Sequence, residues 1–89
     1  MGLLFKQDKI IKVEPKNGHD YSCKECQDMV GGFIEVVNLT NGIIAIVDEE
    51  GALKPDKWIN QDAMLFAMGH GFVGALFGNV LFVDEKELL

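Results

Sequence analysis

The chain has 89 residues, of which 48% are hydrophobic and 25% charged, and its formal net charge is −6. This length and composition are typical of one small globular domain spanning residues 1–89 and disfavour a disordered chain. The lack of a basic patch disfavours nucleic-acid binding through phosphates, and charges interrupt every apolar run before it reaches membrane-spanning length.

The first predicted element is a strand near the N-terminus. Ile10 to Val13 reads as extended, and Leu3 to Phe5 either continues this strand or pairs with it. Pro15 and the turn-forming Asn17-Gly18 end it, because proline lacks a ladder donor and Asn-Gly favours a turn.

A helix is predicted to begin after Ser22. Ser22 and Glu25 have the spacing of a capping box, in which each side chain accepts a hydrogen bond from the other residue's backbone amide. Cys26 and Val30 follow on one apolar face. Gly31 then supplies the left-handed conformation that ends such helices.

A hairpin is predicted next. Phe33 to Leu39 and Ile43 to Val47 are dense in Ile and Val, and Asn41-Gly42 between them favours a two-residue turn. That register is expected to place Leu39 opposite Ile44, Val37 opposite Ile46, and Val36 opposite Val47.

The second half of the chain carries turn, helix-cap and strand signals of the same kinds. A turn at Asp48 to Gly51 leads to a short extended piece at Ala52 to Lys54. Asn60 is a good N-cap for a helix over Gln61 to Met68, and Gly78 to Val83 predicts the last strand.

The predicted order is strand, helix, strand, strand, helix, strand. It indicates an α+β fold, a two-layer sandwich in which the split βαβ of a ferredoxin-like fold is the leading topology. The helices are short for that fold, so a different α+β arrangement is the alternative.

Cys23 and Cys26 form a Cys-x-x-Cys pair at the start of the first predicted helix. A structural zinc site usually needs four ligands, and this pair with the nearby His19 supplies an incomplete set. A thioredoxin-like redox pair would follow a strand directly, whereas several residues intervene here. We favour Cys26 as a buried small hydrophobe and Cys23 as half-exposed, with a metal or redox site as the alternative.

Four further residues are candidate site residues. Gly69-His70-Gly71 could hold an imidazole in a loop, and the loop from Gly69 to Gly78 could offer backbone donors to a small ligand. No nucleophile, carboxylate pair or second histidine stands at a companion spacing, so no catalytic residue and no cofactor is predicted. Trp58 is interpreted either as a lid on the core or as an exposed interface anchor.

Several motifs resemble those of one family. They are Val13-Glu14-Pro15, Val30-Gly31-Gly32-Phe33-Ile34-Glu35, Glu49-Glu50-Gly51-Ala52-Leu53-Lys54, Asn60 with Ala63, and Gly78-Asn79-Val80-Leu81. In this order they are similar to the domain of unknown function 3846 family, small proteins of bacteria, phages and mobile elements. Asn79 stands where that family usually has an acid, and the cysteines fall where it has ordinary helix residues. The resemblance covers nearly the whole chain and implies a small α+β domain in a prokaryotic or phage setting, without an activity to carry over.

We therefore expect a non-enzymatic accessory module that binds a host protein or a second copy of itself. The absence of grouped catalytic residues and a slightly positive mean hydropathy favour this hypothesis. A small-ligand binder of the nucleotide type is the first alternative, and a Cys-x-x-Cys metal or redox protein the second. Residues 1–6 lack the features of a signal peptide or a myristoylation signal, so the expected location is the cytoplasm.

Overall fold

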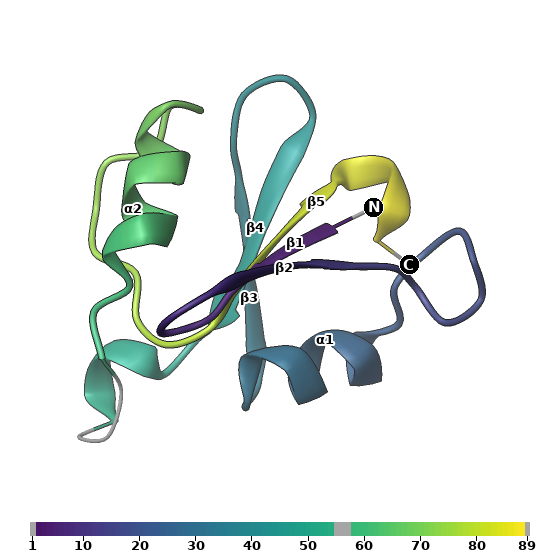
Figure 1. Ribbon diagram of the computed structural model, residues 1–89, viewed down its shortest axis with the longest axis horizontal. Coiled ribbons are helices and arrows are strands. Elements are labelled where there is room, and N and C mark those ends of the chain that lie inside the picture. Colours follow the sequence, from purple (N-terminus) through teal and green to yellow (C-terminus); the bar gives the residue numbers. More distant parts are fainter. Residues whose placement is uncertain (1, 55–57, 89) are drawn as a thin grey trace.

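The computed structural model describes residues 2–54 and 58–88, and these form a five-stranded antiparallel sheet with two α-helices (Figure 1). The strand order is β2-β1-β5-β4-β3. No helix in the described residues is long and apolar enough to cross a membrane. The elements are β1 (Gly2–Phe5), β2 (Ile10–Val13), α1 (Cys23–Val30), β3 (Ile34–Asn38), β4 (Ile43–Asp48), α2 (Gln61–Met68) and β5 (Val80–Asp84), with short 3-10 turns at Gly51–Leu53 and Glu85–Glu87.

The two helices cover opposite faces of the sheet (Figure 1). Side chains alternate along each central strand, so Ile44 and Ile46 of β4 pack on the α1 side while Ala45 and Val47 pack on the α2 side. The α+β class is confirmed. The two-layer arrangement is wrong, because one helix lies on each face and makes three layers.

The N-terminal strands form a hairpin. β1 pairs with β2 antiparallel, with Phe5 opposite Ile10, and β5 lies between β1 and β4. Two strands therefore precede α1 instead of one, and the ferredoxin-like topology is not confirmed. The segment Gly51–Leu53 is a 3-10 turn and not the extended piece expected from the sequence.

The ends of α1 follow the sequence signals. The Ser22 hydroxyl oxygen accepts a hydrogen bond from the Glu25 amide (3.2 Å), and the Glu25 carboxylate accepts one from the Ser22 amide (3.0 Å). Gly31 has a φ of 90° and donates its amide to the Gln27 carbonyl (2.7 Å). The capping box and the glycine stop are both confirmed.

Helix α2 also begins as expected, and the turn that terminates it extends to Gly71. The Asn60 side chain accepts a hydrogen bond from the Ala63 amide (3.0 Å). At the other end, Gly71 has a φ of 91° and donates to the Met68 carbonyl (3.3 Å), while Phe72 donates to Ala67 (3.0 Å). These two bonds form a Schellman motif with Gly71 as its left-handed residue.

The β3–β4 hairpin turns at Asn41-Gly42, but its register differs by one residue from the expected one. Val37 lies opposite Ala45 and not opposite Ile46. The three expected pairs, Leu39 with Ile44, Val37 with Ile46 and Val36 with Val47, are therefore wrong.

In the observed register the Thr40 amide contacts a distant part of the chain instead of β4. Thr40 donates its amide to the carbonyl of His70, which follows α2 (2.9 Å), and Leu39 instead donates to Ile43 (2.9 Å). Thr40 thus joins Asn41 and Gly42 as a third loop residue.

Candidate functional site

Helix α2 buries its alanines against the sheet, where Met64 and Phe66 also pack, and leaves two large apolar side chains in solvent. Ala63 and Ala67 are fully buried, whereas Leu65 is 66% exposed and Met68 56% exposed. A helix at the surface usually shows polar residues on its outer face. After Gln61 and Asp62 in its first turn, the exposed side chains of α2 are therefore apolar where water would favour polar ones.

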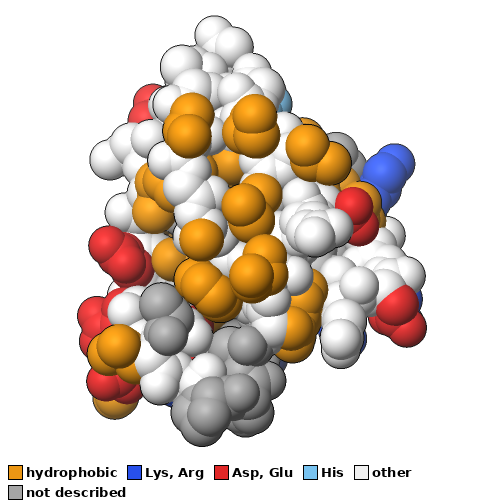
Figure 2. Space-filling model, turned by 90° about the vertical axis from the view of Figure 1, so that its left-hand side faces the viewer, with side chains coloured by type: hydrophobic (Ala, Val, Ile, Leu, Met, Phe, Trp, Pro, Cys, Tyr) orange, Lys and Arg blue, Asp and Glu red, His pale blue; other side chains and the backbone are white. Residues whose placement is uncertain are grey.

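The segments on either side of α2 enlarge this apolar face. Ile59 precedes the helix and is 56% exposed, and Val73 follows it and is 86% exposed. Figure 2 shows hydrophobic side chains gathered across this side of the molecule, with acidic side chains toward its rim. We call the exposed side chains of Ile59, Leu65, Met68 and Val73 the α2 surface.

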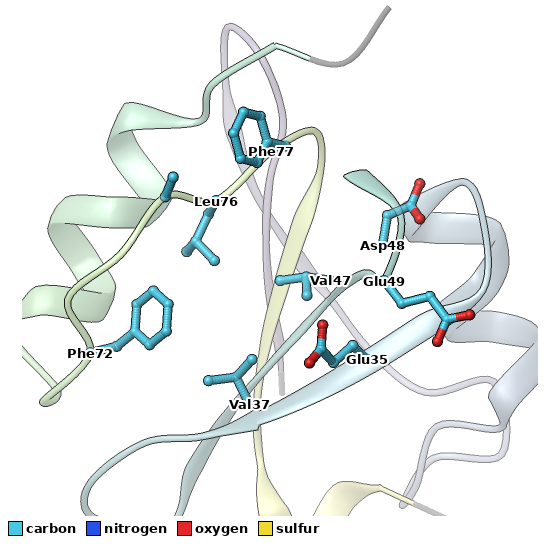
Figure 3. A pocket seen from close by; sticks show the side chains of 9 residues that line it. Glu35, Val37, Val47, Asp48, Glu49, Phe72, Leu76 and Phe77 are labelled. Carbon is cyan, nitrogen blue, oxygen red and sulfur yellow. The ribbon is translucent and has the colours of Figure 1, made fainter. Parts of the chain in front are cut away.

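A pocket of about 230 Å³ lies between the β3–β4 pair and the segment that follows α2 (Figure 3). Its apolar side is formed by side chains from that segment and from the strands, and its acidic side by the carboxylates of Glu35 in β3 and Glu49 after β4. The lining residues are Glu35, Val37, Val47, Asp48, Glu49, Phe72, Ala75, Leu76 and Phe77.

Of the three acidic residues in the lining, Asp48 directs its side chain to the α1 side of the sheet, as does Ile34 opposite it. Asp48 is buried, forms an ion pair with the Lys54 ammonium (2.6 Å) and accepts a hydrogen bond from the Glu50 amide (2.9 Å). Glu35 and Glu49 are exposed at the mouth, and the lining includes no Lys or Arg. The pocket thus favours a cationic group with an apolar stem over an anion.

The Gly69-His70-Gly71 segment uses its backbone donors within the chain. The amides of Gly69, His70 and Gly71 donate to the carbonyls of the last turn of α2, and the His70 carbonyl accepts from Thr40. The His70 ring lies 4.7 Å from the Phe66 ring, and its Nδ1 is buried without a hydrogen-bond partner among the described residues. The ligand site expected here stays a prediction. The amides of these three residues all donate within the chain, so they are not free to bind a ligand.

The two cysteines differ in environment. Cys26 is fully buried in the core beside α1, and burial raises the pKa of its thiol to about 11, with smaller contributions from Cys23 and Glu25. Cys23 and His19 are exposed, and the His19 imidazole lies 3.4 Å from the Asp20 carboxylate. Within residues 2–54 and 58–88, no three His, Cys, Asp or Glu side chains are grouped as metal ligands.

Trp58 is half-buried. This exposure lies between those of the two expected roles, a lid on the core and an exposed interface anchor. Its carbonyl accepts a hydrogen bond from the Gly78 amide (2.8 Å), and the next residue, Ile59, forms an isolated bridge with Phe77. These contacts fix the segment that leads into α2 beside the segment that leads into β5. The role of Trp58 as an interface anchor stays a prediction.

Sequence reasoning missed the two features that dominate this side of the molecule. Glu35, the single charge within the predicted strand Phe33 to Leu39, was the available signal for the pocket. For the α2 surface the signal was the presence of Leu65 and Met68 on the side of the helix away from Ala63 and Ala67. Which side faces the sheet could not be read from α2 alone, since nearly the whole helix is apolar.

One comparison with known proteins gives a match. The sequence model of the family described as Domain of unknown function (DUF3846) matches residues 3–87. No curated protein and no solved structure matches the chain. The match covers nearly the whole chain, as the resemblance of its motifs led us to expect.

Proposed function

The chain belongs to the DUF3846 family, and we propose that it is a non-enzymatic protein-interaction module whose α2 surface binds a basic, apolar segment of a partner protein. The observation that carries this proposal is the exposure of Leu65 and Met68 on a helix that buries only Ala63 and Ala67 completely. Exposed apolar surface of this kind is typical of a protein interface.

The energetic argument rests on the size of the exposed side chains. Burying a Leu, Met or Val side chain contributes about 1.5–3 kcal/mol, so covering the α2 surface supplies a substantial part of a binding free energy. Substitutions of Ala63 or Ala67 by larger residues would instead disturb the core, since both lie in the packed cluster under α2.

Charge supports a basic partner over a second copy of the chain. Asp62 is exposed one turn before Leu65, and Glu35 and Glu49 are exposed at the neighbouring pocket. Two copies, each with a net charge of −6, repel each other, whereas a partner rich in Lys or Arg is attracted. A host protein of a bacterium or phage-infected cell fits the proposal.

Two pairs of exposed residues offer a matched test. Leu65→Gln with Val73→Gln removes apolar area from the α2 surface, and Phe33→Gln with Leu53→Gln removes exposed apolar area elsewhere. Wild type and both variants would be used to capture proteins from a cell lysate, and the recovered partner would be mapped on the isotope-labelled chain by NMR. We expect the α2 variant alone to lose the partner, and the NMR shifts to gather at α2.

Two outcomes would contradict this proposal. Equal loss of the partner from both variants would show that its binding does not depend on the α2 surface. A concentration-dependent dimer in sedimentation, abolished by the α2 variant alone, would identify a second copy as the occupant instead of a basic partner.

A further inference from the structure

We infer that the outer edge of β3 binds an extended basic peptide as an additional strand, and that the pocket beside β3 holds a Lys or Arg side chain of this peptide. The site is separate from the α2 surface, so this inference goes beyond the proposed function. An experiment can contradict one of the two proposals without contradicting the other. The partner class is an extended segment in which apolar and basic residues alternate.

The first observation is the position and backbone orientation of β3. β3 is the last strand of the sheet order and pairs only with β4 among the described residues. Phe33 accepts from Glu49 and Leu39 donates to Ile43, so alternate residues from Phe33 to Leu39 point their backbone groups toward β4. The residues between them therefore direct their amides and carbonyls away from the sheet. These are Ile34, Val36 and Asn38.

The second observation is that this edge carries no Lys or Pro, and that its one charge, Glu35, would attract a basic peptide. Exposed strand edges are commonly guarded by Lys or Pro, and the opposite edge strand β2 contains Lys12. β3 reads Ile-Glu-Val-Val-Asn, and Val36 is 40% exposed. Just past the end of β3, the Thr40 amide donates a hydrogen bond to the His70 carbonyl. An outward-facing backbone group of this edge therefore already pairs with another backbone segment.

The third observation is the pocket on the α2 side of β3 (Figure 3). Glu35 and Val37 point to that side, while Ile34 and Val36 point to the α1 side. An added strand would alternate in the same way, placing every second side chain beside the pocket. A Lys or Arg there would pack its methylenes on Val37 and direct its charge toward Glu35 and Glu49.

Charge and sequence together argue against a second copy as the occupant. A paired β3 from another copy, centred on Val36, would bring Glu35 opposite Val37 and add two carboxylates near the two pockets. β3 contains no Lys or Arg, so a second copy cannot supply the cation from this strand.

The probe that tests the inference is a capped heptapeptide of alternating valine and lysine. With valines opposite the outward residues of β3, the valine amides would donate to β3 and the lysine amides would point away. N-methylation of the valine amides removes those hydrogen bonds, and N-methylation of the lysine amides is the matched control. We expect the first peptide to bind at least about tenfold more weakly than the second in calorimetry.

Two charge variants test the pocket. Glu35→Gln with Glu49→Gln removes the carboxylates at its mouth, and Asp8→Asn with Glu85→Gln changes net charge equally at exposed positions elsewhere. We expect the pocket variant to weaken binding of the parent peptide by about fivefold and the control variant to change it much less. The Leu65→Gln, Val73→Gln variant should bind the peptide as the wild type does, which separates this site from the α2 surface.

Any of three results would overturn the inference. They are the absence of peptide binding at millimolar concentration, equal affinity of the two N-methylated peptides, and equal weakening of binding by the two charge variants. A glutamate-for-lysine peptide that binds as well as the parent would also contradict the proposed cation site. A dimer that Val36→Lys disrupts would assign the β3 edge to a second copy of the chain.

Discussion

Asn60 shows how much of the fold one buried side chain can join. Its Oδ1 accepts a hydrogen bond from the Ala63 amide (3.0 Å), and its Nδ2 donates to the carbonyls of Phe5 (3.0 Å) and Gly78 (2.8 Å). The sequence predicted the first contact, because an N-cap acts within one helical turn. The other two join residues 55 and 18 positions away, which no local pattern indicates.

Asn60→Ala should therefore lower the free energy of unfolding by more than the loss of an ordinary N-cap does. An N-cap contributes about 1 kcal/mol, and two buried carbonyls left without this donor each add about 1 kcal/mol or more. We expect the free energy of unfolding, measured by urea titration, to fall by about 3 kcal/mol. Exposed Asn38→Ala should change it by less than about 0.5 kcal/mol; a loss as small for Asn60→Ala would contradict the role of the three hydrogen bonds.

At the scale of elements, the sequence predicted what neighbouring residues decide and missed what distant residues decide. Ser22, Glu25 and Gly31 set the ends of α1 within one stretch of chain, and these boundaries are correct. In the β3–β4 turn the Thr40 amide bonds to His70, which lies far along the chain, and the expected register is off by one residue.

The end of α2 offers a test of this local control with two nearby glycines. Gly71 has a φ of 91°, and a Cβ there would lie 3.0 Å from the Thr40 methyl carbon, whereas Gly69 has a helical φ of −66° and a Cβ there would meet only the Phe66 carbonyl at 3.4 Å. Gly71→Ala should lower the free energy of unfolding by about 1 kcal/mol or more, because alanine disfavours the left-handed conformation. Gly69→Ala should be neutral or stabilising.

Thermal and urea denaturation of both alanine variants would check this prediction. Similar destabilisation by the two changes would show that the left-handed conformation at Gly71 is not the cause. Because Gly71 lies beside Thr40, NMR of its variant should also show shifts in the β3–β4 turn, and Gly69→Ala should leave that turn unchanged.

At the scale of the whole molecule, the sequence predicted the elements but not the faces they cover. The apolar residues of β4 are buried on both sides, and this pattern is consistent with helices on one face or on both. The α2 surface and the pocket both depend on α2 lying opposite α1. The pocket could not be derived from residue order, because β3, β4 and the segment after α2 meet there. The α2 surface lies within residues 59–73, but packing decides which side of α2 faces the sheet.

The core on the α1 side contains two ionisable groups whose titration should govern stability at alkaline pH. Tyr21 is fully buried and donates its hydroxyl to the Val13 carbonyl (2.9 Å), and burial, with Glu87 and Glu14 adding to it, raises its pKa from 10.0 to about 12. The pKa of Cys26 is raised from 9.0 to about 11, chiefly by burial. Both groups are neutral in the folded core.

For each group the unfolded chain loses its proton at a lower pH than the folded chain, so stability falls as pH rises. The fall begins near pH 9 for Cys26 and near pH 10 for Tyr21, and it ends near the folded values of about 11 and about 12. Each contributes a loss of up to about 3 kcal/mol.

Urea titrations of wild type and Cys26→Ala from pH 8 to pH 11 would measure this loss of stability. The alanine variant should be less stable at pH 8 because of its cavity, yet lose less stability between pH 9 and pH 10, where only the thiol contributes substantially. Parallel curves for the two proteins would show that the thiol is not protonated preferentially in the folded core.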